Sequence, residues 1–181
     1  MLRLRSDDDM NRLTTACLLE LTSTLETVAG QIRSLIITGN QNFFSAGADL
    51  YEIADLNGPS GLEFSRIGQR LMNSIECFPA PVYAAISGYC MGGGLDLALA
   101  CHRRIASPNA IFGHRGAALG LITGWGGTQR LPRLVGKTTA LQMFVTAERI
   151  IAGRALQMAL INAVAEDPAQ YCVNELANRE S

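Results

Sequence analysis

The sequence has almost no net charge, few aromatic residues and no long apolar run. Its 15 Lys and Arg residues nearly balance 16 Asp and Glu residues, which leaves a formal net charge of −1 and a pI of about 6.1. Such a balance forms no electrostatic surface for DNA, RNA or an anionic membrane, so we expect no nucleic-acid partner. No apolar stretch approaches the roughly 20 residues that cross a bilayer, and Met1–Arg5 lacks the apolar centre of a signal peptide. We therefore expect no membrane partner and a cytoplasmic location.

Cysteine is scarce and its positions show no pattern. An odd number of scattered cysteines argues against both a disulfide framework and a metal site. We expect buried thiols in a reducing compartment, and no metal, for Cys17, Cys77, Cys90, Cys101 and Cys172. We interpret the acidic run Asp7–Asp9 as a solvated loop and the basic run His102–Arg104 as a helix end that complements the helix dipole.

A chain of 181 residues with 48% hydrophobic residues can bury a large core in one domain. Strand-like and helix-like segments alternate, which predicts an α/β fold with a mostly parallel sheet flanked by helices. Strands are expected at Leu2–Arg5, Ile32–Thr38, Val82–Ser87, Arg104–Ser107 and Ala110–Phe112. Helices are expected from Cys17 to Gly30 and at Gly61–Phe78, Gly92–Cys101, Thr138–Thr146, Gly153–Leu160 and Pro168–Arg179. In the helix Gly61–Phe78, the inward positions are expected to be Leu62, Ile67, Leu71 and Ile75.

The segment Ile86–Cys101 is the most informative part of the chain. It combines an apolar run, a triple glycine and a periodic apolar stretch, which predicts a buried strand, a tight loop and a helix. The amides at a helix start carry partial positive charge, and Asp96 lies three residues after Gly93, about one helical turn away. Amide donors beside an acid suit chemistry next to a carbonyl that becomes an enolate. The alternative, given equal weight, is that Asp96 only complements the helix dipole.

A second segment of small residues follows another predicted strand. Arg33–Gly39 predicts that strand, and Phe43–Leu50 places glycine and alanine after two aromatic residues. Loops at the carboxyl ends of neighbouring parallel strands meet in one crevice of an α/β sheet. We therefore expect amide donors from the two segments to face each other.

These segments resemble those of the enoyl-CoA hydratase/isomerase (crotonase) superfamily. Three further stretches agree in order and spacing over roughly residues 2–167, and they are Asn11–Thr14, Ile122–Leu131 and Ala147–Ile150. The resemblance implies a crotonase-like (ClpP/crotonase) spiral of ββα units. It also implies a single domain over residues 1–181, without the first N-terminal strand and the C-terminal trimerisation helices of the family, and a homotrimer or hexamer.

Carried over by position, the resemblance implies that the backbone amides of Ala48 and Gly93 form an oxyanion hole for an acyl-coenzyme A thioester. This thioester is the expected substrate, and no other cofactor is expected. Gly124 matches a glycine whose amide positions a water molecule. The residues expected to bind substrate are Ala46, Asp49, Gly92, Gly116, Gly124 and Trp125. Trp125 could form a wall of the acyl pocket or pack as core, and both readings stay open.

The chain differs from the hydratases of this family at the positions of both catalytic glutamates. Asp96 stands where they carry the first catalytic glutamate, and the second falls at Gly116, which has no side chain. Ordinary hydratase activity is therefore in question, because hydration needs one group to orient water and another to supply a proton. His114 is a candidate catalytic residue in place of the missing acid, as is its neighbour Arg115. The alternative for His114, to which we give more weight, is a solvated loop histidine.

The sequence therefore predicts an acyl-coenzyme A enzyme of the hydratase/isomerase type in acyl-CoA or fatty-acid metabolism, with Asp96 and His114 as catalytic candidates. Two alternatives remain: a decarboxylase of the same superfamily, and a non-catalytic subunit that binds acyl-coenzyme A. A dinucleotide-binding domain is disfavoured, because Gly92–Gly94 does not fit the spacing G-x-G-x-x-G.

Overall fold

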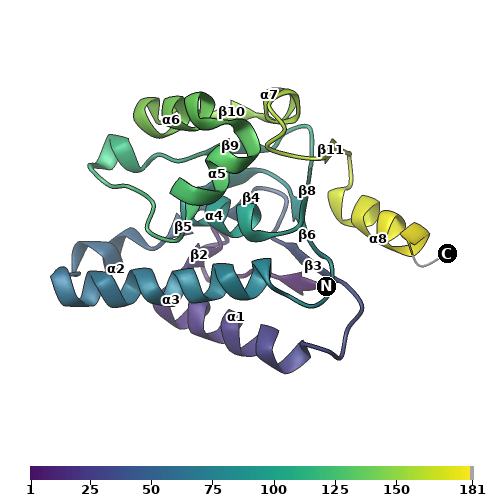
Figure 1. The fold of residues 1–181 in the computed structure, drawn as a ribbon, viewed down its shortest axis with the longest axis horizontal. Helices are drawn as coiled ribbons and strands as arrows, with labels where there is room; N and C mark the ends of the chain where they lie inside the picture. The colour runs from purple at the N-terminus through teal and green to yellow at the C-terminus, as the bar shows by residue number, and fades with distance from the viewer. Residues whose placement is uncertain (180–181) are drawn as a thin grey trace.

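Two sheets of mainly parallel strands form the centre of the molecule, and helices lie around them (Figure 1). The computed structural model describes residues 1–179. The larger sheet is parallel throughout, in the order β1 (Leu2–Arg3), β3 (Leu35–Thr38), β6 (Val82–Ile86), β8 (Arg103–Ala106) and β11 (Ala163–Val164). The second sheet has the order β10 (Ile150–Ile151), β9 (Ile111–Gly113), β7 (Tyr89–Met91) and β4 (Phe43–Ser45), with β10 antiparallel to β9. A parallel pair joins β2 (Arg12–Leu13) to β5 (Gly47–Ala48).

The chain passes repeatedly from the larger sheet to the second sheet. β3 is followed by β4, β6 by β7, and β8 by β9, and helical segments come after each of these pairs. The predicted fold class, a mostly parallel sheet flanked by helices, is confirmed. The strand expected from Ile32 begins only at Leu35, because its partner strand β6 begins at Val82, opposite Leu35.

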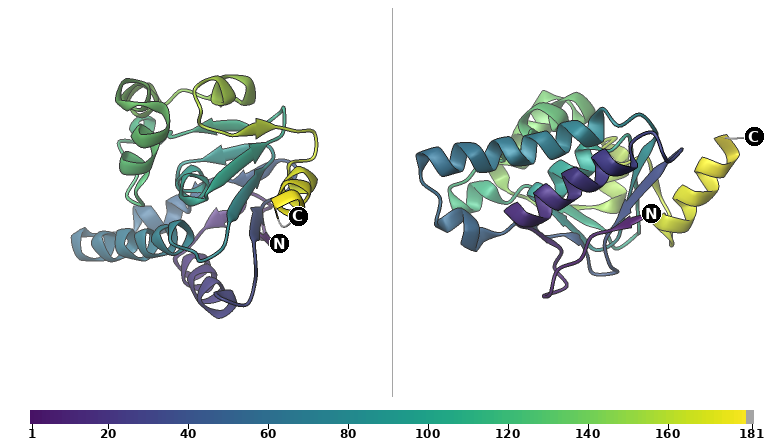
Figure 2. Two further views of the ribbon diagram at one scale, coloured as in Figure 1. Left: turned by 45° about the vertical axis from the view of Figure 1, so that its right-hand side comes forward. Right: turned by 90° about the horizontal axis from the view of Figure 1, so that it is seen from below.

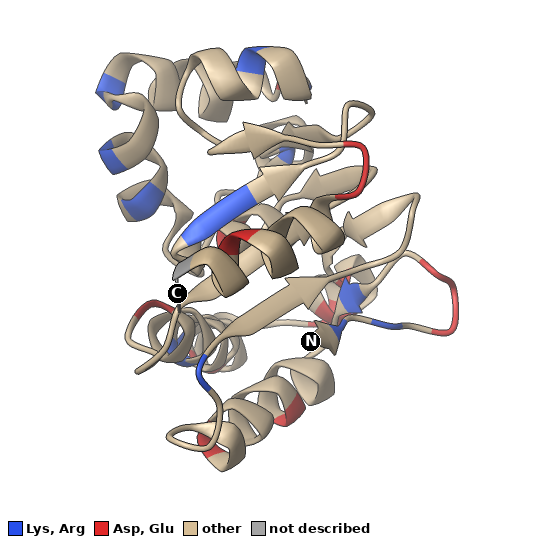
Figure 3. Cartoon of the chain, turned by 90° about the vertical axis from the view of Figure 1, so that its right-hand side faces the viewer, with Lys and Arg blue, Asp and Glu red and all other residues tan. Residues whose placement is uncertain are grey.

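Helices cover both faces of the larger sheet (Figure 2). Their bounds are α1 (Thr15–Val28), α2 (Leu50–Ala54), α3 (Gly58–Glu76), α4 (Gly93–Ala100), η1 (Gly116–Leu119, a 3₁₀ helix), α5 (Gly127–Val135), α6 (Lys137–Thr146), α7 (Ala152–Gln157) and α8 (Pro168–Arg179). α8 lies at the end of the molecule opposite α2 and η1 (Figure 1). None of the helices within residues 1–179 combines the length and the hydropathy needed to cross a membrane. Acidic and basic residues fall on many separate elements (Figure 3).

The two faces of the larger sheet belong to two apolar clusters. Side chains alternate along a strand, so Leu35 and Ile37 enter the main core, whereas Ile36 between them faces the other way. Ile36 packs in a second cluster with Cys172 and Leu176 of α8. Because both faces are covered, every residue of β3 and β6 is buried.

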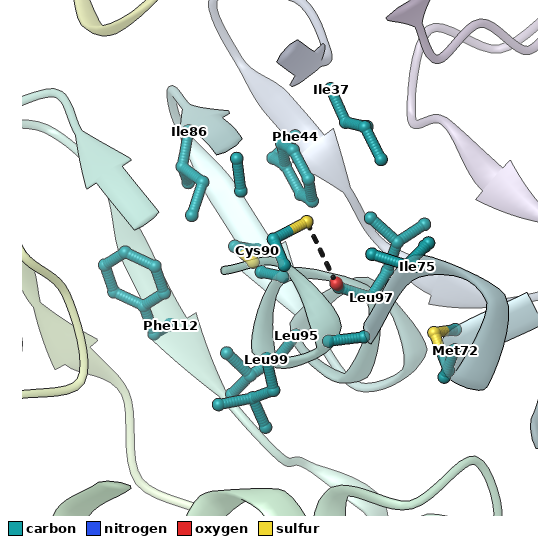
Figure 4. Packing of buried hydrophobic residues seen from close by; sticks show 14 of the residues in the cluster. Ile37, Phe44, Met72, Ile75, Ile86, Cys90, Leu95, Leu97, Leu99 and Phe112 are labelled. Carbon is teal, nitrogen blue, oxygen red and sulfur yellow. Dashed lines mark hydrogen bonds between the residues drawn. The ribbon is translucent and has the colours of Figure 1, made fainter. Parts of the chain in front are cut away.

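α4 runs through the middle of the main core (Figure 4). From Gly94 to Ala100 every residue of this helix is buried, including Asp96. The thiol of Cys90 in β7 donates to the carbonyl oxygen of Gly94 at 3.5 Å, which ties the strand to the first turn of the helix. The core therefore fixes the position of the helix start, where the sequence places the chemistry.

Several expected details were wrong. Leu62 is 53% exposed, whereas the predicted inward positions Leu71 and Ile75 are buried and Ile67 packs partly buried against the core. Phe64, Gly68 and Met72 complete the inward face of α3. α2 and α5 were not predicted, since one is very short and the other begins at Gly126–Gly127 and contains Pro132. The expected helix Gly153–Leu160 already ends at Gln157. Of the cysteines, Cys77 is exposed and Cys17 only partly buried.

Candidate active site

Two backbone segments meet at the start of α4. Gly47 in β5 has a φ of +96°, and a Cβ atom there would lie 2.8 Å from the amide nitrogen of Gly93. A Cβ atom on Gly93 would in turn lie 3.2 Å from the amide nitrogen of Ala48. Only glycine permits so close an approach of the two segments. The structure thus brings together the two amides that the sequence selected, although their role as donors stays a prediction.

The first turn of α4 exposes amides toward this meeting point. The amide of Asp96 donates to the carbonyl oxygen of Gly92 at 3.0 Å and so closes the first turn of the helix. The amides of the residues between them have no acceptor within the helix, and they carry its partial positive charge. Gly92, Gly93 and Ala48 all line the same cavity. A developing oxyanion in this cavity would meet that charge.

Asp96 is a buried carboxyl group with two unequal oxygens. Its side chain is 1% exposed, and the hydroxyl of Thr123 donates to Oδ2. Oδ1 lies 3.4 Å from Nε2 of His114. Burial raises the pKa of Asp96 to about 7, although the bond from Thr123 and the charge of Arg130 act in the opposite direction. The group can therefore gain or lose a proton near neutral pH, as a general acid or base must.

His114 follows β9 and is 4% exposed, so the reading as a solvated loop histidine was wrong. Its ring packs against that of Phe144 at 5.1 Å between centroids. Burial lowers the pKa of His114 to about 4, which leaves the imidazole neutral near pH 7. The contact with Asp96 is therefore no ion pair at that pH. Neither Nε2 of His114 nor Oδ1 of Asp96 has a hydrogen bond within the described residues.

A cavity of about 950 Å³ opens beside these groups. Its polar side chains include Asp96, His114 and Thr123, and most of the remaining wall is apolar. The apolar wall comes from α2, α3, the segment after η1, and α6, and includes Leu50, Ile53, Phe64, Leu121, Ile122, Leu141 and Phe144. The volume and lining suit an apolar group that enters beside a few fixed polar atoms.

Most of the predicted site residues line this cavity. They are Ala46, Ala48, Gly92, Gly93, Asp96, His114, Gly116, Gly124 and Trp125. Trp125 fits both of the readings left open, since it lines the cavity and is only 3% exposed. Its ring lies 5.2 Å from that of Phe64, and the Gly124 carbonyl before it accepts from Gln69 at 2.7 Å.

Asp49 is not among the residues that line the cavity. Its Oδ1 accepts from the amides of Tyr51 at 2.8 Å and Glu52 at 3.2 Å, so the side chain caps α2. Its Oδ2 lies 3.2 Å from Nη1 of Arg12. These contacts hold the start of α2 in place, and the predicted role of Asp49 in substrate binding stays a prediction.

Sequence reasoning missed Thr123 and the contribution of α3. Thr123 lies directly before Gly124, but nothing in its neighbourhood along the chain indicates a bond to Asp96, 27 residues away. Phe64 and Ser65 reach the cavity from α3. The helical spacing of apolar residues predicts only which face of α3 points inward. The part of that face that lines a cavity is set by how α3 packs against residues 124–125, which the spacing does not reveal.

Comparison with known proteins gives matches over almost the whole chain. A family model for enoyl-CoA hydratase/isomerase matches residues 1–178. The "probable enoyl-CoA hydratase" of Bacillus subtilis (strain 168) is 48% identical over 165 residues, which cover 88% of this chain and 63% of that protein. The crotonyl-CoA hydratase of Syntrophomonas wolfei is 41% identical over 160 residues, covering 87% of this chain and 62% of that protein. The chain therefore spans less than two thirds of the length of these relatives.

Solved structures agree with the sequence matches. The enoyl-CoA hydratase from Bacillus anthracis superposes with a TM-score of 0.92 at 35% identity, over 97% of this chain and 70% of that one. DspI from Pseudomonas aeruginosa gives a TM-score of 0.89 at 36% identity, over 93% of this chain and 66% of that one.

Proposed function

The chain belongs to the enoyl-CoA hydratase/isomerase family, and we propose that it converts an enoyl-coenzyme A thioester through an enolate, by hydration or by shift of the double bond. The observation that carries this proposal is the position of Asp96. A buried carboxyl group with a pKa of about 7 lies in the wall of a cavity that Ala48 and Gly93 also line. The names of the related hydratases support the same reaction class.

In this proposal, the thioester carbonyl oxygen binds between the amides of Ala48 and Gly93. As the enolate forms, negative charge develops on this oxygen, and two donors together with the positive end of α4 stabilise it. Removal of one such donor typically costs about 10²- to 10³-fold in turnover. Asp96 transfers the proton at the α- or β-carbon, because it is the ionisable side chain that the first turn of α4 directs into this cavity.

His114 is proposed as the second proton-handling group. Its Nε2 lies 3.4 Å from Asp96, it lines the cavity, and its ring is neutral at pH 7. Arg115 is exposed and carries a guanidinium group, which only donates hydrogen bonds, so it is a poor replacement for an acid that must exchange protons. Gly116 supplies no side chain, and the backbone of Leu121 occupies part of the space beside it.

Assembly into a homotrimer or hexamer is part of the same proposal, as the family resemblance implies. Leu141 and Val145 of α6 are more than 60% exposed beside the cavity, and such apolar surface usually marks a contact site. Light scattering coupled to size exclusion measures the assembly, and a monomer at micromolar concentration contradicts it.

To test the reaction, the protein is incubated with crotonyl-, 3-enoyl- and malonyl-type coenzyme A thioesters, and the products are identified by mass spectrometry. In parallel, a saturated acyl-coenzyme A in D₂O reports enolate formation through deuterium uptake at the α-carbon. We expect a hydrated or isomerised product, and a loss of at least about 10²-fold in Asp96→Asn with acyl-CoA affinity retained. The matched control is Glu26→Gln, an exposed acid on α1, which leaves turnover unchanged.

Three results contradict the proposal. If release of carbon dioxide is the sole reaction, the protein is a decarboxylase. If the protein binds acyl-coenzyme A tightly but gives no product and no deuterium uptake, it is a non-catalytic binding subunit. Full turnover in Asp96→Asn would remove Asp96 from the mechanism.

A further inference from the structure

We propose that Thr123 is a positioning residue which directs the transferable proton of Asp96 to Oδ1, the oxygen that faces His114. This inference rests on the proposed function, because it concerns the proton that Asp96 transfers. Thr123 itself is not assigned contact with the reacting atoms.

The hydrogen bonds of Asp96 are asymmetric. Oδ2 accepts from the Thr123 hydroxyl, whereas Oδ1 has no hydrogen bond and faces Nε2 of His114 at 3.4 Å. A hydroxyl hydrogen directed at Oδ2 disfavours a second proton on that atom, so the proton of the neutral acid resides on Oδ1. Nε2 then faces a donor, which requires the imidazole tautomer with its hydrogen on Nδ1.

Packing holds the three side chains in this arrangement. They come from separate elements: Asp96 from α4, His114 from the end of β9, and Thr123 from the segment before α5. Gly127, the first residue of α5, lies where they converge. A Cβ atom there would overlap Oδ1 of Asp96 and lie 2.9 Å from Cγ2 of Thr123 and 3.1 Å from Cε1 of His114. Glycine at this position lets the three groups meet.

Burial leaves the proton of the pair on Asp96 rather than on His114. Burial raises the pKa of Asp96 to about 7 and lowers that of His114 to about 4, so the carboxyl group holds the proton more strongly. Arg130 of α5 also acts on this site, since its charge lowers the pKa of Asp96, and the thiol of Cys90 in β7 lies within reach of Asp96. Arg115 and Arg149 line the same cavity. The Cys90 thiol stays protonated, because burial raises its pKa well above its usual value.

The proton balance of the step is simple. Asp96 gives the proton on Oδ1 to the enolate carbon, so an O–H bond breaks, a C–H bond forms, and the carboxylate remains bonded to Thr123. In hydration, the water molecule whose hydroxyl group bonds to the β-carbon releases the other proton, which restores Oδ1 directly or through Nε2 of His114. Without Thr123 the carboxyl group can carry the proton on Oδ2, away from His114.

The first test measures the carboxyl group itself. Asp96 in aspartate-¹³C-labelled protein is titrated by infrared or NMR spectroscopy and assigned by comparison with Asp96→Asn. We expect its pKa to rise in Thr123→Val, since a bond that lowers it is lost, and to return to the wild-type value in Thr123→Ser. This readout needs no turnover, so it separates a failure of this inference from a failure of the proposed function. An unchanged pKa in Thr123→Val and in the smaller Thr123→Ala overturns the inference.

The second test uses catalysis. Thr123→Val should lower kcat about 10- to 10²-fold with little change in KM. It should also move the alkaline limb of the kcat/KM profile to higher pH, because Asp96 must be protonated to act as the acid. Thr123→Ser should recover most of the activity. In a His114→Gln background the further loss caused by Thr123→Val should be several-fold smaller, because the two residues act on one proton. Thr128→Val, five residues away in the first turn of α5, is the matched control and should change neither kcat nor the profile.

A purely structural role predicts a different pattern. Thr123→Val would then lower the melting temperature while kcat and the pH profile stay as in the wild type, and its effect would add to that of His114→Gln. Either result overturns the inference.

Discussion

Burial of Asp96 and His114 links the stability of the protein to pH through two opposing effects. The folded pKa of Asp96 is raised to about 7 from 3.8, so its contribution to stability is lost as the pH rises through this interval. The folded pKa of His114 is lowered to about 4 from 6.5, so its contribution is lost as the pH falls through that interval. Between about pH 4 and 6.5 the pair holds one proton in both folded and unfolded chains, on His114 when unfolded and on Asp96 when folded. The two effects therefore offset each other.

Single substitutions should separate these two effects. In Asp96→Asn only the histidine effect remains, so the free energy of unfolding should rise with pH between about 4 and 6.5. In His114→Gln it should fall as the pH rises between about 4 and 7, and each slope is at most about 1.4 kcal/mol per pH unit. Urea unfolding at half-unit pH steps, compared with the wild type, measures the slopes. Slopes of the same sign in both variants would contradict the assignment.

Restoring an acid at position 116 should not create the paired carboxylates of the hydratases. A Cβ atom on Gly116 would lie 2.7 Å from the carbonyl oxygen of Leu121, whose amide bonds the Gly116 carbonyl at 2.8 Å. We expect Gly116→Glu to lower stability by about 1–3 kcal/mol without raising turnover. Thermal unfolding and the crotonyl-CoA assay check both points, with Ala118→Glu, exposed in the same 3₁₀ helix, as control. A gain in hydration rate would show that the loop opens readily.

At the residue scale, the sequence predicted those site residues whose positions follow from nearby residues in the chain. The spacing of Gly93 and Asp96 within one helical turn was enough to place both at the site. Burial of His114 depends on Phe144 and on α4, which lie far away along the chain, and this is why the expected exposure was wrong. The bond from Thr123 depends on tertiary packing in the same way.

At the element scale, one side chain packs against both α3 and α4. The Trp125 ring lies against Gly68 of α3 and Gly93 of α4, where any Cβ atom would overlap it. The loop that carries Trp125 is fixed by Arg130, which donates to the Trp125 carbonyl at 3.2 Å and pairs with Glu76 of α3 at 2.6 Å.

Alanine substitutions in α3 should therefore have opposite effects on stability. Gly68→Ala collides with the indole and should cost about 1–3 kcal/mol, because the ring or the helix must shift. Gly61→Ala has no atom within 4 Å of the new methyl group and should stabilise by about 0.5–1 kcal/mol, since alanine favours the helix. Chemical unfolding of both variants gives the comparison. Equal effects at the two positions would show that Trp125 is not packed against Gly68.

Prediction of the elements succeeded where periodicity extends over a long segment. α3 and α8 have enough turns to reveal their helical character, whereas α2 is shorter than two turns. α5 begins after Gly126, which adopts a left-handed φ of +103°. The sequence around it predicts a loop, because it contains two consecutive glycines and Pro132.

At the scale of the whole molecule, the fold class followed from the alternation of strands and helices, whereas the distribution of thiols did not. Cys90 and Cys101 lie in the main core, and burial raises their pKa values, that of Cys101 to about 12. Cys77 follows α3 and is exposed. A count of cysteines cannot reveal this difference, because it depends on which side of the helix end faces solvent.

Thiol modification of the native protein should reflect this difference. We expect Cys77 to react with a disulfide reagent at the rate of an accessible thiol, while Cys90 and Cys101 react only on unfolding. Peptide mapping after timed modification at pH 8 identifies the modified positions. Cys77→Ser should remove the fast phase, and its persistence in that variant would contradict the assignment.

The chain has a single tryptophan, and that residue touches the glycine that begins α4 and forms part of the cavity wall. The molecule therefore contains its own optical probe, and emission excited selectively at the indole comes from one place beside the proposed thioester site. Titration with an acyl-coenzyme A should change the intensity or wavelength of that emission. Ligand occupancy could then be followed on unlabelled protein, even in variants that no longer turn over.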